Sequence, residues 1–114
     1  MSSKSDWSDP LFLEDFLTEE EKSIKINTRN FCKKNLLPNV VKYNRNHYFD
    51  KEIYKDFGSM GFLGSTIKGF GSPEINKISY GLIAYEIESV DSSYRSAISV
   101  QSSLVCEPIE LFGS

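Results

Sequence analysis

Apolar side chains recur at helical spacing along most of this chain, and the first such stretch follows a clear start signal. Thr18 and Glu21 have the spacing of a capping box, in which each side chain accepts a hydrogen bond from an otherwise unpaired backbone amide. The apolar face that follows consists of Leu17, Ile24, Thr28 and Phe31. We expect an extended arm over residues 1–16, then a helix that ends near Pro38.

A second helix is predicted near residues 50–60, beginning at Asp50 and stopped by Gly61, a residue type that favours the left-handed turn after a helix. Its apolar face is formed by Ile53, Phe57 and Met60. The glycine-rich stretch from Gly61 to Gly71 is either a phosphate-binding loop or a connector with tight turns. The glycine spacing matches neither the P-loop nor the dinucleotide fingerprint, which favours the connector.

The next helix is predicted to begin at Ser72, as the N-cap, with Pro73 at the first helical position. Its apolar stripe consists of Ile75, Ile78, Leu82 and Val90. Gly81 interrupts this stripe, and because a helical glycine is destabilising by about 1 kcal/mol relative to alanine, we expect close backbone packing there.

A last helix is expected from a cap at Asp91 or Ser92 to about Phe112, with Pro108 disturbing its final turns. Short connections between these segments, with no convincing strand, predict an all-α fold, an antiparallel bundle of four to five helices. The helical domain is expected to span residues 17–114.

Composition and charge narrow the class of protein. A chain of 114 residues forms one domain at most, and a net charge of −3 argues against a nucleic-acid surface, which needs a concentrated basic face. No apolar run reaches the roughly 18–20 residues that span a bilayer, and the N-terminus has no hydrophobic signal core. Cys32 and Cys106 lie in apolar segments without metal-ligand spacing, so we expect buried, reduced thiols.

The residues alone offer no catalytic machinery. His47, the only histidine, lies in a polar stretch without a second metal-ligand residue nearby, so a solvated loop position is favoured. Glu86 and Glu88 are two residues apart and diverge on a helix, which favours salt bridges over coupled acid–base work. No serine has a matching histidine for a nucleophilic triad. We therefore predict no catalytic residue and no metal site.

Arg95 is the one charge within DSSYRSAISVQSSLVCE between the acids at its two ends. On a helix, Ser99 lies one turn ahead of it, Ser92 one turn behind and Ser96 beside it. Because an unpaired buried guanidinium is destabilising by several kcal/mol, three interpretations remain open. The side chain pairs with an acid of the same chain, extends to solvent, or binds a carboxylate or phosphate. Its fork of donors suits a planar carboxylate.

Four segments carry a resemblance to a known family. These are DWSDPLFLEDFLTEEE, GFLGSTIKGFG, AYEIESVDSS and YRSAISVQSSL. Together they resemble the acyl-CoA dehydrogenase flavoproteins, in particular the members specific for glutaryl-CoA, from about Asp6 to Ser114. The resemblance implies the helical N-terminal domain, with the middle β-domain and the C-terminal helical domain absent from this chain.

The resemblance also implies a function and its partners. Such enzymes use FAD to convert glutaryl-CoA to crotonyl-CoA and CO2, pass electrons to electron-transfer flavoprotein, and usually form homotetramers. The compartment implied is the mitochondrial matrix in a eukaryote and the cytoplasm in a bacterium. FAD would be bound mainly by the domains absent here, so this chain alone is expected to be inactive. The alternative is a truncated, non-catalytic helical fragment that acts as an interaction module.

Within the resemblance, the YRSAxS motif assigns substrate binding to three residues, Arg95, Ser96 and Ser99, all of which match. In the glutaryl-specific members these positions hold the distal carboxylate of the acyl chain. The lone arginine would then select a dicarboxylic acyl group over a plain fatty one.

Overall fold

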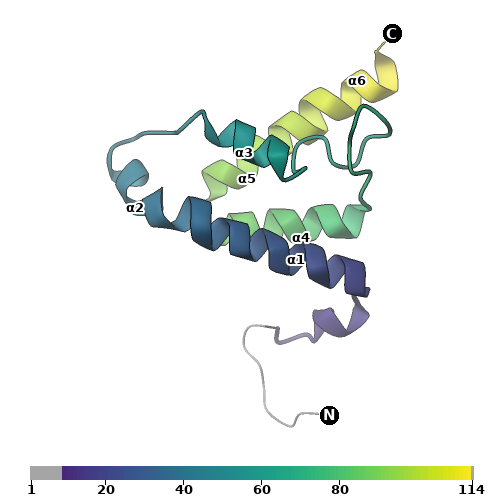
Figure 1. The fold of residues 1–114 in the computed structure, drawn as a ribbon, viewed down its shortest axis with the longest axis horizontal. Coiled ribbons are helices and arrows are strands. Elements are labelled where there is room, and N and C mark those ends of the chain that lie inside the picture. Colours follow the sequence, from purple (N-terminus) through teal and green to yellow (C-terminus); the bar gives the residue numbers. More distant parts are fainter. Residues whose placement is uncertain (1–8, 114) are drawn as a thin grey trace.

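The structure is a computed structural model that describes residues 9–113, and these residues form helices and turns without a strand. The predicted all-α fold is therefore confirmed. Figure 1 shows the elements in chain order. They are η1 (Leu13–Phe16), α1 (Glu19–Phe31), η2 (Cys32–Leu36), α2 (Leu37–Arg45), α3 (Ile53–Ser59), α4 (Lys77–Glu88), α5 (Ser92–Ser99), η3 (Val100–Cys106) and α6 (Glu107–Phe112).

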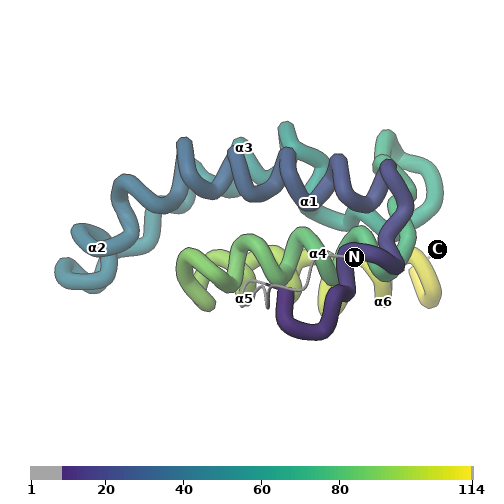
Figure 2. The backbone as a smooth tube through the Cα atoms, turned by 90° about the horizontal axis from the view of Figure 1, so that it is seen from below, coloured from purple at the N-terminus to yellow at the C-terminus, as the bar shows by residue number. Residues whose placement is uncertain are grey.

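The helices form two layers, as Figure 2 shows. One layer contains the continuous rod of α1, η2 and α2 together with α3, and the other contains α4 and the second rod of α5, η3 and α6. Helix α4 packs against α1 across the layers and against α5 within its own layer. The result is a thin slab, with principal extents of 54 × 37 × 19 Å.

An aromatic cluster lies between the two layers. The rings of Phe31 and Phe62 meet edge to face at 5.4 Å, and those of Phe57 and Tyr94 do so at 6.3 Å. Such pairs add to the stabilisation that burial alone provides. The buried apolar core as a whole consists of Phe31, Cys32, Leu36, Ile53, Phe57, Phe62, Ile83, Ile87, Tyr94 and Ile98.

The first rod starts where the sequence predicts but extends beyond the predicted end. Thr18 Oγ1 accepts from the Glu21 amide at 3.2 Å, and Glu21 Oε1 accepts from the Thr18 amide at 3.4 Å, which confirms the capping box. The expected end at Pro38 is wrong, because the helix continues to Arg45. The residues before the proline, Cys32–Leu36, widen into π-helical turns, which accommodate a residue that lacks an N–H and crowds the preceding turn.

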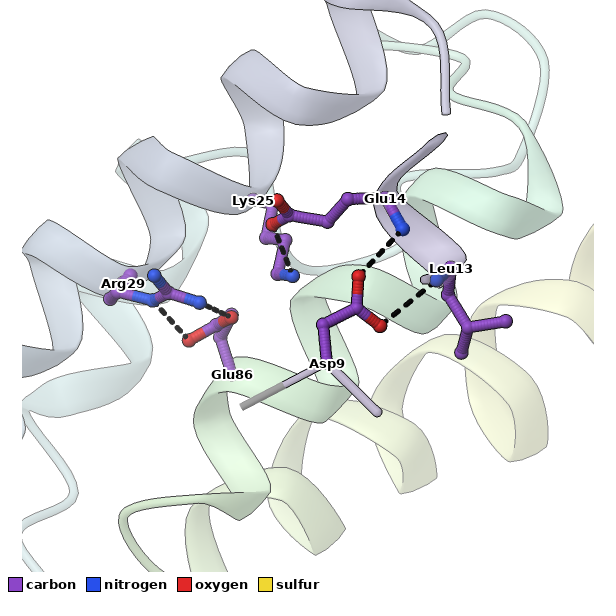
Figure 3. Close-up of polar contacts among 6 residues, drawn as sticks. All are labelled: Asp9, Leu13, Glu14, Lys25, Arg29 and Glu86. Atoms are coloured by element: carbon purple, nitrogen blue, oxygen red, sulfur yellow. Dashed lines mark hydrogen bonds and ion pairs between the residues drawn. The ribbon is translucent and has the colours of Figure 1, made fainter. Parts of the chain in front are cut away.

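The arm is likewise not extended throughout. Of residues 1–16, the structure describes 9–16, and Leu13–Phe16 form a 3-10 turn. Asp9 caps this turn, because its carboxylate accepts from the amides of Leu13 at 2.9 Å and Glu14 at 3.0 Å (Figure 3).

Gly61 ends α3 as predicted. Its φ of +74° is in the left-handed region, where glycine carries no steric penalty. The Phe62 amide donates to the Phe57 carbonyl at 2.9 Å and the Gly61 amide to the Gly58 carbonyl at 3.0 Å, which is the hydrogen-bond pair of a Schellman motif. Met60, predicted on the buried face, is the C-cap and is 42% exposed.

Helix α3 also starts later than predicted, at Ile53 rather than Asp50. Asp50 instead forms the preceding turn, in which its carbonyl accepts from the Ile53 amide at 3.2 Å and its carboxylate from the Glu52 amide at 3.0 Å.

Helix α4 differs from its prediction in both start and buried face. It begins at Lys77 with Asn76 as the N-cap, whose side chain accepts from the Ser79 amide at 2.7 Å. A helix from Pro73 is prevented because Glu74 has a left-handed φ of 52°. The buried residues are Ser79, Ile83, Glu86 and Ile87, whereas Ile78 of the predicted stripe is exposed. The close packing expected at Gly81 is also wrong, because a Cβ there would have no atom within 4 Å.

The last helix runs from Ser92 to Phe112, as predicted, with Asp91 as its N-cap. The disturbance expected near Pro108 lies before it, in the π-helical η3. Both rods therefore contain a π-helical stretch that ends two residues before a proline, at Leu36 before Pro38 and at Cys106 before Pro108.

A buried ion pair joins α1 to α4 (Figure 3). Arg29 Nε and Nη2 donate to the two carboxylate oxygens of Glu86 at 3.1 and 2.9 Å. The Glu86 side chain is 6% exposed and that of Arg29 is 45% exposed, so the carboxylate depends on the arginine for its charge partner. The hydrogen bond to Glu86 raises the pKa of Arg29 above its ordinary value.

We predict that Arg29→Ala lowers the free energy of unfolding by about 2 kcal/mol, because it leaves the buried Glu86 carboxylate without a partner. Replacing both residues together by leucine should restore stability to within about 1 kcal/mol of the wild-type chain. Urea denaturation of the single and double variants measures both values.

The matched control is Lys55→Ala, which removes an exposed ion pair to Glu52 and should change stability by no more than about 0.5 kcal/mol. Equal losses in Arg29→Ala and Lys55→Ala would contradict a structural role for the buried pair.

We predict that the two free cysteines differ in their reactivity toward alkylating reagents. Cys32 is buried in the core, and burial, with a smaller contribution from the Glu86 charge, raises the pKa of its thiol to about 11. Because the thiolate is the reactive form, iodoacetamide at pH 8 should modify Cys106 in the folded chain and Cys32 only after unfolding in urea. Mass spectrometry of the digested protein measures both sites. Equal modification rates in the folded chain would contradict the burial of Cys32.

Candidate functional site

Helix α5 places the three sequence-predicted site residues. Asp91 caps the helix by accepting from the Ser93 amide at 2.7 Å. Tyr94 and Ile98 are buried, four residues apart, and hold one face of α5 on the core. Arg95 and Ser99 are also four residues apart, so they share the helix face next to the buried one, and both are partly exposed. Ser96 is exposed.

Arg95 has an acidic partner within the chain. Its Nε donates to Glu88 Oε2 at 2.7 Å, and the two side chains are 37% and 47% exposed. Glu88 is the last residue of α4, and a tight turn, in which the amides of Val90 and Asp91 both donate to the Ile87 carbonyl, brings it to Arg95. Of the three interpretations left open by the sequence, pairing within the chain is thus observed, together with partial exposure to solvent.

The contact with Glu88 leaves most of the Arg95 donors available. Only Nε takes part, and the terminal guanidinium nitrogens make no hydrogen bond to any other of residues 9–113. The Ser96 and Ser99 hydroxyls likewise have no hydrogen-bond partner among these residues. The geometry therefore presents a cation with an open planar edge, on a helix face that also carries the Ser99 hydroxyl one turn ahead.

Glu88 is the residue of this cluster that the sequence interpretation did not connect to Arg95. Both acids of α4 were predicted to form salt bridges, and both do, Glu86 with Arg29 and Glu88 with Arg95. The signal that could have identified the second pair is the cap at Asp91, because a short turn between two helices brings the end of one near the first turn of the next.

Two amides of the glycine-rich segment, Gly61 to Gly71, have hydrogen-bond partners from the second rod. The Gly64 amide donates to Ser102 Oγ at 3.0 Å, and the Lys68 amide donates to a carboxylate oxygen of Glu110 at 2.8 Å. These amides are thus already used, and the Glu110 charge would repel a phosphate. Gly64 itself allows a close approach, because a Cβ there would lie 3.2 Å from Cys106 Sγ. The connector interpretation therefore fits the structure.

The remaining candidates carry no catalytic geometry. His47 is exposed, as predicted, and lines a cavity of about 270 Å³ with the aromatic residues Tyr43, Tyr48, Phe49 and Tyr94. Within residues 9–113, no three His, Cys, Asp or Glu side chains are grouped as metal ligands would be. Across the same residues, no helix combines the length and the apolar character needed to cross a bilayer.

A solved structure shares this fold. The glutaryl-CoA dehydrogenase from Mycobacterium smegmatis, determined in complex with FADH2, superimposes with a TM-score of 0.89 and is 36% identical in sequence. The match covers 90% of this chain and 27% of that enzyme.

Two curated proteins are similar in sequence. The mitochondrial short-chain specific acyl-CoA dehydrogenase of Mus musculus is 27% identical over 99 residues, and an acyl-CoA dehydrogenase of Bacillus subtilis (strain 168) is 24% identical over 99 residues. Each match covers 86% of this chain, which spans about a quarter of the length of either relative, 24% and 26% respectively.

The family assignment rests on a match across most of the chain. Residues 18–114 match the acyl-CoA dehydrogenase N-terminal domain. The matched segment begins at the capping box of α1 and includes both helical layers and the Arg95 cluster. The chain therefore belongs to the acyl-CoA dehydrogenase family, of which it carries the helical N-terminal domain.

Proposed function

We propose that this chain is the substrate-facing helical domain of an FAD-dependent enzyme that oxidatively decarboxylates glutaryl-CoA. The observation that carries the proposal is the free edge of the Arg95 guanidinium, on the face of α5 that also carries Ser99. The 36% identity to a glutaryl-CoA dehydrogenase supports the same substrate class.

The chemistry of glutaryl-CoA suits this cluster. Its acyl chain ends in a carboxylate, which a fatty acyl-CoA lacks, and a guanidinium can donate two parallel hydrogen bonds to the two oxygens of a carboxylate. The Ser96 and Ser99 hydroxyls can donate further hydrogen bonds. A plain acyl chain at this position would leave the cation without a ligand, so the cluster would favour dicarboxylic substrates.

Glu88 has a positioning role in this proposal. By accepting from Nε, it fixes the plane of the guanidinium and leaves the opposite edge free for the substrate. The negative charge of Glu88 also repels the carboxylate of a substrate. Two hydrogen bonds from the guanidinium would offset this repulsion, whereas a ligand with a single weak acceptor would bind less tightly.

The contacts of the glycine-rich segment argue against a flavin diphosphate there. The Gly64 and Lys68 amides are already paired, and the partner of Lys68 is the Glu110 carboxylate, whose charge would repel the diphosphate of FAD. FAD would accept a hydride from the acyl group when bound, and we propose that other parts of a longer protein bind it and supply the catalytic base. Electron-transfer flavoprotein as electron acceptor and a homotetramer are part of the same proposal.

A second candidate function is a non-catalytic interaction module. The exposed apolar side chains of α6 and of the glycine-rich segment favour it, because they offer a surface for another protein part. The largest are Phe70, Ile109, Leu111 and Phe112. The two functions differ in their dependence on Arg95, which a binding surface on α6 would not need.

We predict that Arg95→Ala acts selectively on glutaryl-CoA. In a chimera that carries residues 18–114 in place of the matching segment of the Mycobacterium smegmatis enzyme, the loss of a bidentate contact should lower kcat/KM for glutaryl-CoA by about 30- to 1000-fold. Butyryl-CoA, which has no distal carboxylate, should react at a nearly unchanged rate. Arg95→Lys should restore only part of the loss, because an ammonium keeps the charge without the planar fork.

The control for this prediction is Arg45→Ala, which removes an exposed arginine at the end of α2. It should leave both substrates unaffected. If Arg95→Ala lowered kcat/KM equally for both acyl-CoA substrates while flavin content stayed constant, Arg95 would be a structural residue and the proposal would fail.

We also predict a smaller effect for Ser99→Ala. Its hydroxyl is neutral and has no partner among residues 9–113, so its removal should cost about 1 kcal/mol, or roughly a fivefold loss in kcat/KM for glutaryl-CoA. Ser103→Ala, at an exposed position one turn further along the rod, serves as the matched control and should have no effect. Identical kinetics for the Ser99 and Ser103 variants would remove Ser99 from the site.

A further inference from the structure

A cavity lined by four aromatic side chains lies where the end of α2 and the loop after it meet the start of α5. Its volume is about 270 Å³, and the four rings are those of Tyr43, Tyr48, Phe49 and Tyr94. Arg95 is not among the residues that line this aromatic cavity, so it is separate from the candidate site for an acyl chain.

The turn after α2 builds one side of the aromatic cavity. The helix ends at Arg45, and the chain reverses at His47, whose φ of 52° is in the left-handed region. The Tyr48 amide then donates to the Tyr43 carbonyl at 2.9 Å. The rings of the two tyrosines meet edge to face at 5.0 Å, so the turn fixes both of them at the cavity.

The core of the domain fixes the other two rings. Tyr94 of α5 is buried, and its ring lies 5.8 Å from that of Phe49 with an interplanar angle of 45°. Phe49 itself packs against the buried core. Rings from two segments that are far apart in sequence therefore line one cavity, and the face of an aromatic ring attracts a cation.

The charges at the aromatic cavity also favour a cation. The Asp91 carboxylate lines it, and Oδ1 accepts from the Ser93 amide at 2.7 Å, whereas no residue among 9–113 donates to Oδ2. Burial, with smaller contributions from the Asp91 and Asp50 charges, raises the pKa of Tyr94 above its ordinary value. No lysine or arginine lines the cavity, and His47 is the one basic side chain that does.

We propose that the aromatic cavity binds the quaternary ammonium group of a small organic cation. The rings supply cation–π attraction and contacts for the methyl groups, and Asp91 supplies the opposite charge. A quaternary ammonium has no N–H to donate, so it suits walls of aromatic rings with a single carboxylate. A calcium or magnesium ion does not fit, because it needs about six oxygen ligands.

A comparison of choline with 3,3-dimethylbutan-1-ol tests this proposal, because the alcohol has the same shape with a neutral carbon in place of the nitrogen. NMR titration of the folded 114-residue chain measures both dissociation constants. Choline should bind saturably and at least about tenfold more tightly than the alcohol. Equal affinities, or no saturable binding of choline, would overturn the proposal.

Phosphocholine distinguishes a free cation from the headgroup of a lipid. Its phosphate would be repelled by Asp91 and Asp50, so it should bind more weakly than choline. Tighter binding of phosphocholine would overturn the assignment to a free cation.

Two variants place the binding in the aromatic cavity. Asp91→Asn removes the charge and keeps a favourable N-cap residue for α5, and it should weaken choline binding about fivefold. Tyr48→Leu removes a ring that is 55% exposed and lies outside the buried core, and it should weaken binding by a similar factor, about fivefold.

The matched controls are Asp15→Asn and Tyr85→Leu, which make the same changes at exposed positions that do not line the aromatic cavity. Both should bind choline as tightly as the wild-type chain, and circular dichroism should show the same helix content in all four variants. Wild-type affinity in folded Asp91→Asn and Tyr48→Leu would contradict the proposed site, as would equal losses in the cavity variants and the controls.

Discussion

The rotation of α4 about its own axis is the constraint on which both the core and the candidate site depend. Two acids, separated by one residue, leave this helix in different directions. Glu86 is buried between the layers and pairs with Arg29 of α1, whereas Glu88 is half exposed and pairs with Arg95 of α5. A rotated α4 would leave a buried carboxylate unpaired and would release the guanidinium at the same time.

The local signals of the sequence predicted part of this fold. The capping box at Thr18 and Glu21 and the stop at Gly61 were readable, because each depends on hydrogen bonds within one turn. The continuation through Pro38 was not, because a π-helical stretch arises from how the whole rod packs and leaves no short motif.

The hydrophobic spacing of α4 does not predict which of its faces is buried. The helix is apolar on two sides, with Ile83 and Ile87 buried in the core and Ile78 exposed on another side. Hydrophobic spacing fits either face, and the polar Ser79 and Glu86 turned out to lie on the buried one. Arg95 was recognisable as the single charge in a neutral helix, but its partner was not, because Glu88 belongs to the preceding helix.

The open edge of the Arg95 guanidinium is the central claim about function, and its most direct test is a comparison of two ligands of the same shape. Glutaryl-CoA and its monoamide differ only in whether the distal group is a carboxylate or a neutral carboxamide. For the chimera that carries residues 18–114, the measurement is the dissociation constant of each ligand by flavin absorbance titration. The account predicts that glutaryl-CoA binds at least about tenfold more tightly, because its contact with Arg95 is charge-assisted, and that Arg95→Ala abolishes the difference. Equal affinities in the unsubstituted chimera would contradict it.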